Sequence, residues 1–136
     1  MNDQQVESEI QAKKLTAPRV TPQDIEANIA NEHYFTAADG YAGAASVGDM
    51  SGLPTDESGL PLIDPPQELE LLTFCVLVLK NGFTVTGESA CASPKNFDAE
   101  LGREIARQNA VNKIWPLMGY ALKQRLYEQS PTGYAK

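Results

Sequence analysis

The stretch that decides the fold is Leu71–Ala92, LLTFCVLVLKNGFTVTGESACA, near the middle of the 136-residue chain. Its first part, Leu71–Leu79, is a continuous apolar run rich in residues that favour β-strands. After Asn81-Gly82, the segment Phe83–Thr86 alternates apolar and polar side chains with the period of two that a strand requires. Asn-Gly is the pair preferred by two-residue type I′ turns. We therefore predict an antiparallel β-hairpin with an Asn-Gly turn.

This turn also predicts the register of the hairpin. A two-residue loop places Lys80 opposite Phe83 and Val78 opposite Val85. The first strand is then apolar on both of its faces, and an isolated two-stranded hairpin is only marginally stable in water. Helices or a second subunit must therefore cover it.

A long helical pattern follows the hairpin. Asn96-Phe97-Asp98 offers an N-cap, and apolar residues then recur on one broad face as far as Leu126. Pro116 lies inside the pattern and removes one helical hydrogen bond. We predict a helix from Asp98 to Ile114, a kink or break near Pro116, and a shorter second helix.

The segment before the hairpin begins with a helix signal. Thr21 and Pro22 provide a capping hydroxyl and a proline in the first turn, which predicts a helix from Pro22 to Glu32. Residues 36–66 then hold five of the ten glycines and four of the nine prolines, which indicates a long Gly/Pro-rich loop. This loop is either a mobile surface segment or a lid that orders over a ligand or partner.

The fold class predicted from these elements is α+β, with an N-terminal helix, the hairpin and a C-terminal helix. We expect a flexible N-terminal tail over residues 1–17, a single α+β domain over 18–128 and a flexible C-terminal tail over 129–136.

The charge is acidic and uneven. Lys and Arg number 11 against 18 for Asp and Glu, a formal net charge of -7. Residues 1–66 carry 3 cations against 11 acids, whereas residues 67–136 carry 8 against 7. General nucleic-acid binding needs clustered cations and is therefore disfavoured. The order of hairpin and helix resembles a double-stranded-RNA-binding domain, but a third strand and a basic helix N-terminus are missing. There is no apolar run of membrane-spanning length and no signal-peptide pattern at the first residues, so we expect a cytoplasmic protein and no membrane partner.

Metal and cofactor sites lack their usual residues. The chain has one histidine, His33, and two cysteines, Cys75 and Cys91, with no Cys-x-x-Cys or His-x-x-x-His spacing. We predict no metal and no cofactor. In the predicted register the two cysteines lie on opposite faces of the hairpin, which disfavours a disulfide unless a bulge at Gly87 shifts the phase of the strand.

Cys91 is the one candidate nucleophile. It precedes a predicted helix whose N-terminus would lower the pKa of a thiol, and only His33 is available as a base. A half-buried structural cysteine is the plainer interpretation, and we predict no catalytic residue.

Candidate binding residues fall into an aromatic group and a basic group. The aromatic group follows the first predicted helix, where such side chains either plug the core or form a recognition surface. The basic group lies on the C-terminal helix, where Glu100 and Glu104 precede arginines by three residues and a solvated face explains the charges. The candidates are His33, Tyr34, Phe35, Arg103, Arg107, Lys113 and Trp115.

A second stripe of mostly small residues on the C-terminal helix permits close approach of another element. We predict a homodimer, the simplest way to bury this stripe and the two-sided apolar strand. The expected interface residues are Ala110, Ile114 and Leu117.

Four segments resemble a family of small tailed-phage and prophage proteins, known by gene product 49 of one phage and gene 66 of another. They are residues 19–40, 72–77, 81–92 and 96–120. The similarity spans about 19–126 and is weakest between 41 and 68. It implies an accessory protein made in the cytoplasm of an infected bacterium, and it carries no activity and no site residue over to this chain.

The leading functional hypothesis is a non-enzymatic interaction module that binds a host or phage macromolecule, with a role in host takeover or in countering host defence. The alternative is a protein that binds or sequesters a small nucleotide-type ligand. That alternative needs Arg103, Arg107 or Lys113 to converge with Trp115, Tyr34 or His33 around a pocket. The third hypothesis is an enzyme that uses Cys91.

Overall fold

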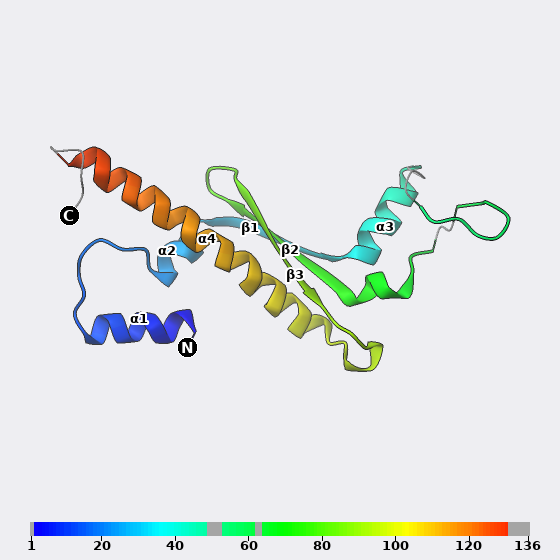
Figure 1. The fold of residues 1–136 in the computed structure, drawn as a ribbon, viewed down its shortest axis with the longest axis horizontal. Helices are drawn as coiled ribbons and strands as arrows, with labels where there is room; N and C mark the ends of the chain where they lie inside the picture. The colour runs from blue at the N-terminus through cyan, green and yellow to red at the C-terminus, as the bar shows by residue number, and fades with distance from the viewer. Residues whose placement is uncertain (1, 49–52, 62–63, 131–136) are drawn as a thin grey trace. The chain divides into compact units, whose positions relative to one another are not determined.

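The computed structural model describes residues 2–48, 53–61 and 64–130 (Figure 1). The fold is α+β, as predicted: an N-terminal helix, a three-stranded antiparallel sheet in the order β1-β2-β3, and a long C-terminal helix. The elements are α1 (Asp3–Ala12), α2 (Pro22–Ala27), β1 (Ile29–Thr36), α3 (Ala37–Ser46), η1 (Gln67–Leu71), β2 (Leu72–Leu79), β3 (Thr84–Ala90), η2 (Pro94–Asn96) and α4 (Ala99–Gln129).

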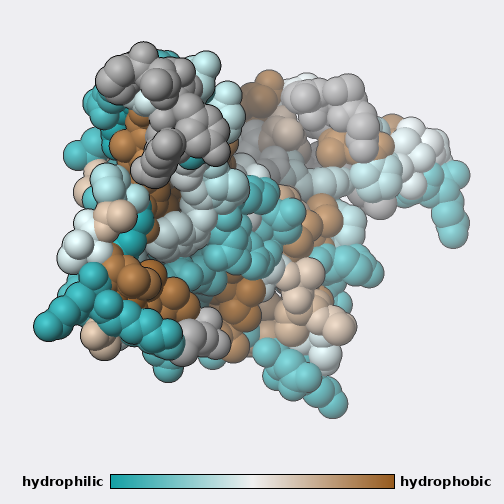
Figure 2. Space-filling model, turned by 60° about the vertical axis from the view of Figure 1, so that its left-hand side comes forward, coloured by the Kyte–Doolittle hydropathy of each residue, from teal (hydrophilic) through white to brown (hydrophobic). Residues whose placement is uncertain are grey.

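The described residues form two compact units. Of the described residues, the first unit contains 2–31, 77–85 and 111–130, and the second unit contains 32–48, 53–61, 64–76 and 86–110. All three strands and α4 contribute residues to both units. In the space-filling view, apolar surface lies in patches between polar side chains (Figure 2).

The predicted hairpin is confirmed, but its turn is of a different type. The Leu79 N–H donates to the Phe83 carbonyl at 2.8 Å, and the Gly82 N–H donates to the Leu79 carbonyl at 2.9 Å. Gly82 has φ +90°, whereas the φ of Asn81 is not positive, as a type I′ turn would require. The loop therefore has three residues and a left-handed glycine at its end, and the two-residue type I′ prediction is wrong.

The extra loop residue shifts the register by one. Leu77 lies opposite Val85, and Cys75 lies opposite Gly87, since Leu79 pairs with Phe83. Leu77 and Val85 are both buried, and so are Cys75 and Gly87. The predicted pairing of Val78 with Val85 is therefore wrong.

The same shift changes the relation between the two cysteines. The Cys91 N–H donates to the Leu71 carbonyl at 3.0 Å, which places Cys91 on the same face as Cys75. Both thiols are free. They are separated by four residues along the strand direction, about 13 Å, and not by the opposite faces that the sequence predicted.

The helix predicted over 22–32 is only half present. Thr21 caps α2 through a capping box with Asp24, but α2 ends at Ala27 and the chain continues as strand β1. The Lys80 N–H donates to the Asn28 carbonyl at 3.0 Å, where β1 meets the end of β2. Pairing with β2 therefore overrides the helical spacing of the segment. This third strand also removes one of the two objections to an RNA-binding fold, whereas the first turn of α4 is acidic rather than basic.

Two further helices occupy segments predicted to lack them. Within the expected flexible tail 1–17, α1 begins at a capping box between Asn2 and Gln5. Within the expected loop 36–66, α3 begins at a capping box between Thr36 and Asp39. Residues 49–52 and 62–63 of the predicted loop, and 131–136 of the predicted C-terminal tail, lie outside the described residues.

The C-terminal helix starts where the sequence predicts. The Asp98 carboxylate accepts a hydrogen bond from the Leu101 N–H at 3.0 Å, and α4 then runs for 31 residues with Pro116 inside it. The predicted break at Pro116 is therefore absent. Ala110 and Ile114 are fully buried just before the proline, and this packing offsets the cost of a proline in a helix interior.

In the second unit, α4 packs against one face of the sheet at very short range. A Cβ atom built on Gly87 would stand 2.1 Å from the Ala106 carbonyl oxygen, so β3 and α4 approach with no room for a side chain. Gly102 lies close to Thr73 as well, since a Cβ atom built on Gly102 would stand 3.2 Å from the Thr73 hydroxyl oxygen. The buried residues Cys75, Ala106 and Ala110 therefore place the core of this unit between the sheet and α4. Figure 1 shows the ribbon of α4 beside the strands.

Candidate functional site

The second unit carries a half-exposed sheet face on the side opposite Thr73 and Cys75. Burial alternates along β2: Thr73 and Cys75 are buried, whereas Leu72, Phe74 and Val76 are only partly covered. The register places Thr86 opposite Val76 and Glu88 opposite Phe74. We call this surface the open face; its residues are His33, Phe35, Leu72, Phe74, Val76, Thr86 and Glu88.

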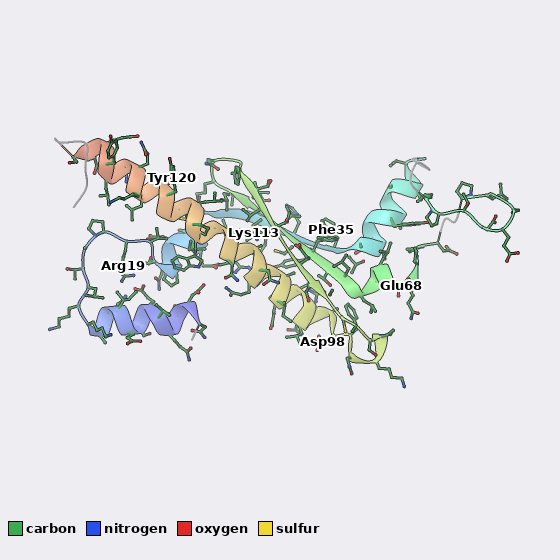
Figure 3. The ribbon with its side chains drawn as sticks, in the orientation of Figure 1. Arg19, Phe35, Glu68, Asp98, Lys113 and Tyr120 are labelled. Carbon is green, nitrogen blue, oxygen red and sulfur yellow. The ribbon has the colours of Figure 1, made fainter. Side chains whose placement is uncertain are left out.

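An aromatic pair lies at the centre of the open face. The rings of Phe35 and Phe74 have their centroids 5.7 Å apart and are tilted by 34°. Phe35 remains 40% exposed although it belongs to a strand (Figure 3). Exposed aromatic side chains held by a rigid neighbour are typical of the residues that contribute most to binding.

The charge of the open face is negative. Glu88 stands across from Phe74 in β3 and is exposed. The Asn109 side chain donates to the Glu88 carbonyl at 2.8 Å and so ties this part of β3 to α4. Lys and Arg are absent from the open-face residues defined above, so this surface favours a cationic or neutral ligand over a phosphate.

His33 lies on the open face because its neighbours point the other way. Arg107 of α4 donates through Nε to the Glu32 carboxylate at 2.9 Å. Tyr34 faces the Cys75 thiol, and burial raises the pKa of Tyr34 to about 12, with Cys75 and Glu32 adding to the rise. Side chains alternate across a strand, so His33 and Phe35 share the open side.

The environment of Tyr34 and Cys75 is that of a structural cluster. Burial raises the pKa of the Cys75 thiol above its ordinary value, so the thiol stays protonated at neutral pH. Tyr34 is likewise neutral, and Arg107 is engaged by Glu32. Of the aromatic candidates, Tyr34 therefore packs against the core, whereas Phe35 is exposed to solvent.

The remaining sequence candidates are divided between the units. Arg103 is exposed on α4 in the second unit, whereas Lys113 and Trp115 belong to the first unit. The Trp115 indole Nε1 donates to the Asp3 carboxylate of α1 at 3.1 Å. A cavity of about 240 Å³ lies beside Trp115; its other lining residues are Asp3, Val6, Glu7, Ile10, Val20 and Pro22. The cations expected around Trp115 are not among the residues of this cavity.

The residues predicted for an oligomer interface differ in how far their side chains are exposed. Ala110 and Ile114 have no exposed surface, because they pack inside the chain's own core. Leu117 is 40% exposed. Of the three, only Leu117 is accessible to a second chain.

Cys91 is placed differently from the sequence prediction. Its thiol donates to the Ser93 carbonyl at 3.2 Å, and seven residues, including η2, separate it from the first residue of α4. Asp98 already caps that helix N-terminus. The helix-based activation proposed for the thiol therefore lacks its geometry.

Sequence reasoning missed one basic cluster. In the first unit, Arg19, Lys80 and Arg125 line a single cavity of about 440 Å³. They are distant in sequence and carry no motif, so only the fold brings them together. Among residues 2–48, 53–61 and 64–130, no three His, Cys, Asp or Glu side chains gather as a metal site requires. Nor does that part of the chain contain a helix long and apolar enough to cross a membrane.

Together, a sheet covered on one side by α4 and an aromatic pair on its other side define a small α+β protein. The chain belongs to the Phage protein (N4 Gp49/phage Sf6 gene 66) family, whose model matches residues 20–126. This confirms the resemblance stated from the sequence. Comparisons with curated proteins and with solved structures gave no match.

Proposed function

We propose that this phage protein is a non-enzymatic binding protein, and that its open face binds a partner protein of the host or the phage. The Phe35–Phe74 pair is the observation that carries the proposal, because Phe35 is exposed on the sheet and Phe74 beside it is only partly buried. Interfaces concentrate their binding energy in such aromatic anchors, surrounded by polar groups. Thr86 and Glu88 supply polar groups on the neighbouring strand.

The chemistry of the open face favours a protein over a nucleic acid. Single-stranded nucleic acids also stack on aromatic side chains, but they require cations along the path of the phosphates. Glu88 lies directly across the strand pair from Phe74 and would repel a phosphate. The same carboxylate would pair with a Lys or Arg side chain of a protein partner.

The form of the open face favours binding without catalysis. Catalytic sites are concave and enclose their substrate. The cavities described above are lined by residues of the first unit, whereas the open face belongs to the second unit. In a phage protein, such a surface is suited to neutralising or redirecting a host protein in the cytoplasm of the infected bacterium.

Affinity capture from infected-cell lysate with two matched variants tests the proposal. Phe35→Ser removes the more exposed ring of the aromatic pair, and Phe83→Ser removes another exposed phenylalanine, which directly follows the hairpin loop in the first unit. We expect one protein to be recovered with the wild-type chain and with Phe83→Ser. With Phe35→Ser its recovery should fall by about tenfold or more, the usual effect of losing a binding anchor.

The affinity of the captured protein is then measured with purified components by calorimetry, after thermal melts have shown that both variants are folded. Equal affinity for wild-type and Phe35→Ser would refute the proposed site. Loss of the captured material after nuclease treatment would show that a nucleic acid, rather than a protein, is bound.

A further inference from the structure

The first unit contains a cavity that combines cations with an apolar wall. Its volume is about 440 Å³, within the range of pockets that hold small organic ligands. The charged and polar residues of the lining are Arg19, Asp24, Asn28, Lys80 and Arg125, and the apolar residues are Val20, Ala27, Met118, Ala121 and Leu122.

Three cations reach this cavity from three separate segments. Arg19 lies between α1 and α2 (Figure 3), Lys80 lies in the hairpin loop, and Arg125 lies near the end of α4. The whole chain has only 11 Lys and Arg residues and a net charge of -7. Lys80 and Arg125 are exposed, and neither forms an ion pair with the residues that the structure describes. Two of the three charges are therefore available to an anion.

Arg19 is held in position from behind. The Glu7 carboxylate accepts hydrogen bonds from both terminal nitrogens of the guanidinium, and the bond to Nη2 measures 2.8 Å. Hydrogen bonding from Arg19, and then from Gln11, lowers the pKa of Glu7 to about 2. A guanidinium has five N–H donors, and this arrangement uses two of them. Because Glu7 already restrains the side chain, Arg19 loses little conformational entropy when it binds a ligand through its remaining donors.

We propose that this cavity binds a small phosphorylated molecule of nucleotide size. The phosphate lies among Lys80, Arg125 and the free donors of Arg19, because multiple cations favour a multiply charged anion over a single carboxylate. The apolar body of the ligand contacts Met118 and Leu122. The site and its ligand class are independent of the open face in the second unit.

The polar residues of the lining fit the same arrangement. The Asp24 carboxylate repels a phosphate, so the phosphate is placed toward Lys80 and Arg125 instead. One Asp24 oxygen accepts the Thr21 N–H at 2.9 Å, which leaves the other oxygen to accept from a hydroxyl of the ligand. The side-chain amide of Asn28 provides a further donor at the cavity wall.

Calorimetric titration of the full chain with AMP, ATP and inorganic phosphate tests this site. We expect AMP and ATP to bind, and inorganic phosphate to bind at least about tenfold more weakly because it cannot contact the apolar wall. Absence of binding by AMP and ATP at millimolar concentration would overturn the proposal. Equal binding of phosphate and AMP would overturn the assignment of a nucleotide-sized ligand.

Matched variants locate the site. Arg125→Met and Lys80→Met remove cavity cations, whereas Arg103→Met and Lys95→Met remove exposed cations of the second unit. Each cavity variant should weaken nucleotide binding by about tenfold, the effect of one charge-assisted hydrogen bond, and each control should change it less than about twofold. Similar losses in the cavity and control variants would show non-specific attraction and refute the site. Phe35→Ser should leave nucleotide binding unchanged. The proposal for this cavity and the proposal for the open face are therefore tested independently of each other.

Discussion

Gly87 in β3 lies directly against the backbone of Ala106 in α4. A Cβ atom on Gly87 would stand 2.1 Å from the Ala106 carbonyl oxygen and 2.3 Å from the Ala110 nitrogen. Backbone atoms of a helix cannot move aside as the end of a flexible side chain can. The small residues of α4 that the sequence assigned to a partner chain therefore serve the close packing of the protein's own sheet.

Replacing Gly87 should be severely destabilising. We expect Gly87→Ala to lower the free energy of unfolding by about 3 kcal/mol, because strand and helix must separate to admit one methyl group. Gly119→Ala is the matched control, since a Cβ atom there meets nothing within 4 Å. It should raise the free energy of unfolding by about 0.5–1 kcal/mol through helix propensity. Urea denaturation measures both, and a Gly87→Ala variant as stable as wild type would contradict the packing.

The hairpin loop gives a second stability test. Gly82→Ala should cost about 1–2 kcal/mol, because Gly82 has φ +90° and an L-residue is strained there. Asn81→Ala should cost about 0.5–1 kcal/mol, since it removes only the hydrogen bond from the Phe83 N–H to Asn81 Oδ1 at 2.9 Å. A type I′ turn would instead make both substitutions similarly costly. Thermal melts of the two variants distinguish these outcomes.

The Glu7–Arg19 pair predicts a specific dependence of stability on acid pH. The pKa of Glu7 is lowered from 4.5 to about 2 in the folded chain, so its contribution to stability is complete above about pH 4.5 and is lost as the pH falls toward 2. Glu7→Gln should therefore melt at a lower temperature than wild type at neutral pH, and this difference should shrink between pH 4.5 and 2.

Trp115 is a suitable probe for that experiment, because it is the only tryptophan and its indole donates to Asp3 of α1. Glu9→Gln is the control, since Glu9 pairs with Lys13 on the exposed side of the same helix. It should melt like wild type throughout. A constant difference between Glu7→Gln and wild type across this pH range would show that the ion pair does not anchor α1.

Self-association is the last prediction. Leu117 and Tyr120 are exposed three residues apart on α4, and we expect a homodimer at micromolar concentration that uses this part of the helix. Leu117→Asp should shift the mass measured by light scattering from two chains to one. Leu101→Asp, at an exposed apolar position of α4 in the second unit, should leave the dimer intact. A wild-type mass of one chain would refute the dimer itself.

The sequence predicted the features of the fold that depend on interactions between residues a few positions apart. The cap at Thr21, the cap at Asp98 and the strands around Asn81-Gly82 were all predicted from the sequence and are present. Two further local signals were overlooked, namely the capping boxes that begin at Asn2 and Thr36. Glutamine or aspartate three residues after a capping side chain would have indicated α1 and α3.

The residues of the candidate sites could be predicted from the sequence pattern to a much smaller extent. Phe35 was identified as a binding residue because it is aromatic, but its position was placed at a helix end rather than on a sheet. Phe74 completes the exposed pair, although the sequence pattern indicates only that it lies in the first strand of the hairpin. Arg19, Lys80 and Arg125 were not grouped at all, since 61 and 45 residues separate them along the chain.

By itself, the sequence determined the α+β class, the hairpin and the ends of two helices, because caps, turns and side-chain periodicity act between neighbours. Only the tertiary structure decided that 29–36 is a strand, since hydrogen bonding to β2 outweighs the helical spacing of that segment. It also decided the register, because Asn-Gly is compatible with loops of two or three residues and burial of Leu77 with Val85 selects the longer one. Only the tertiary structure brings the three cavity cations together as well, because charges that are distant in sequence meet only after the chain has packed.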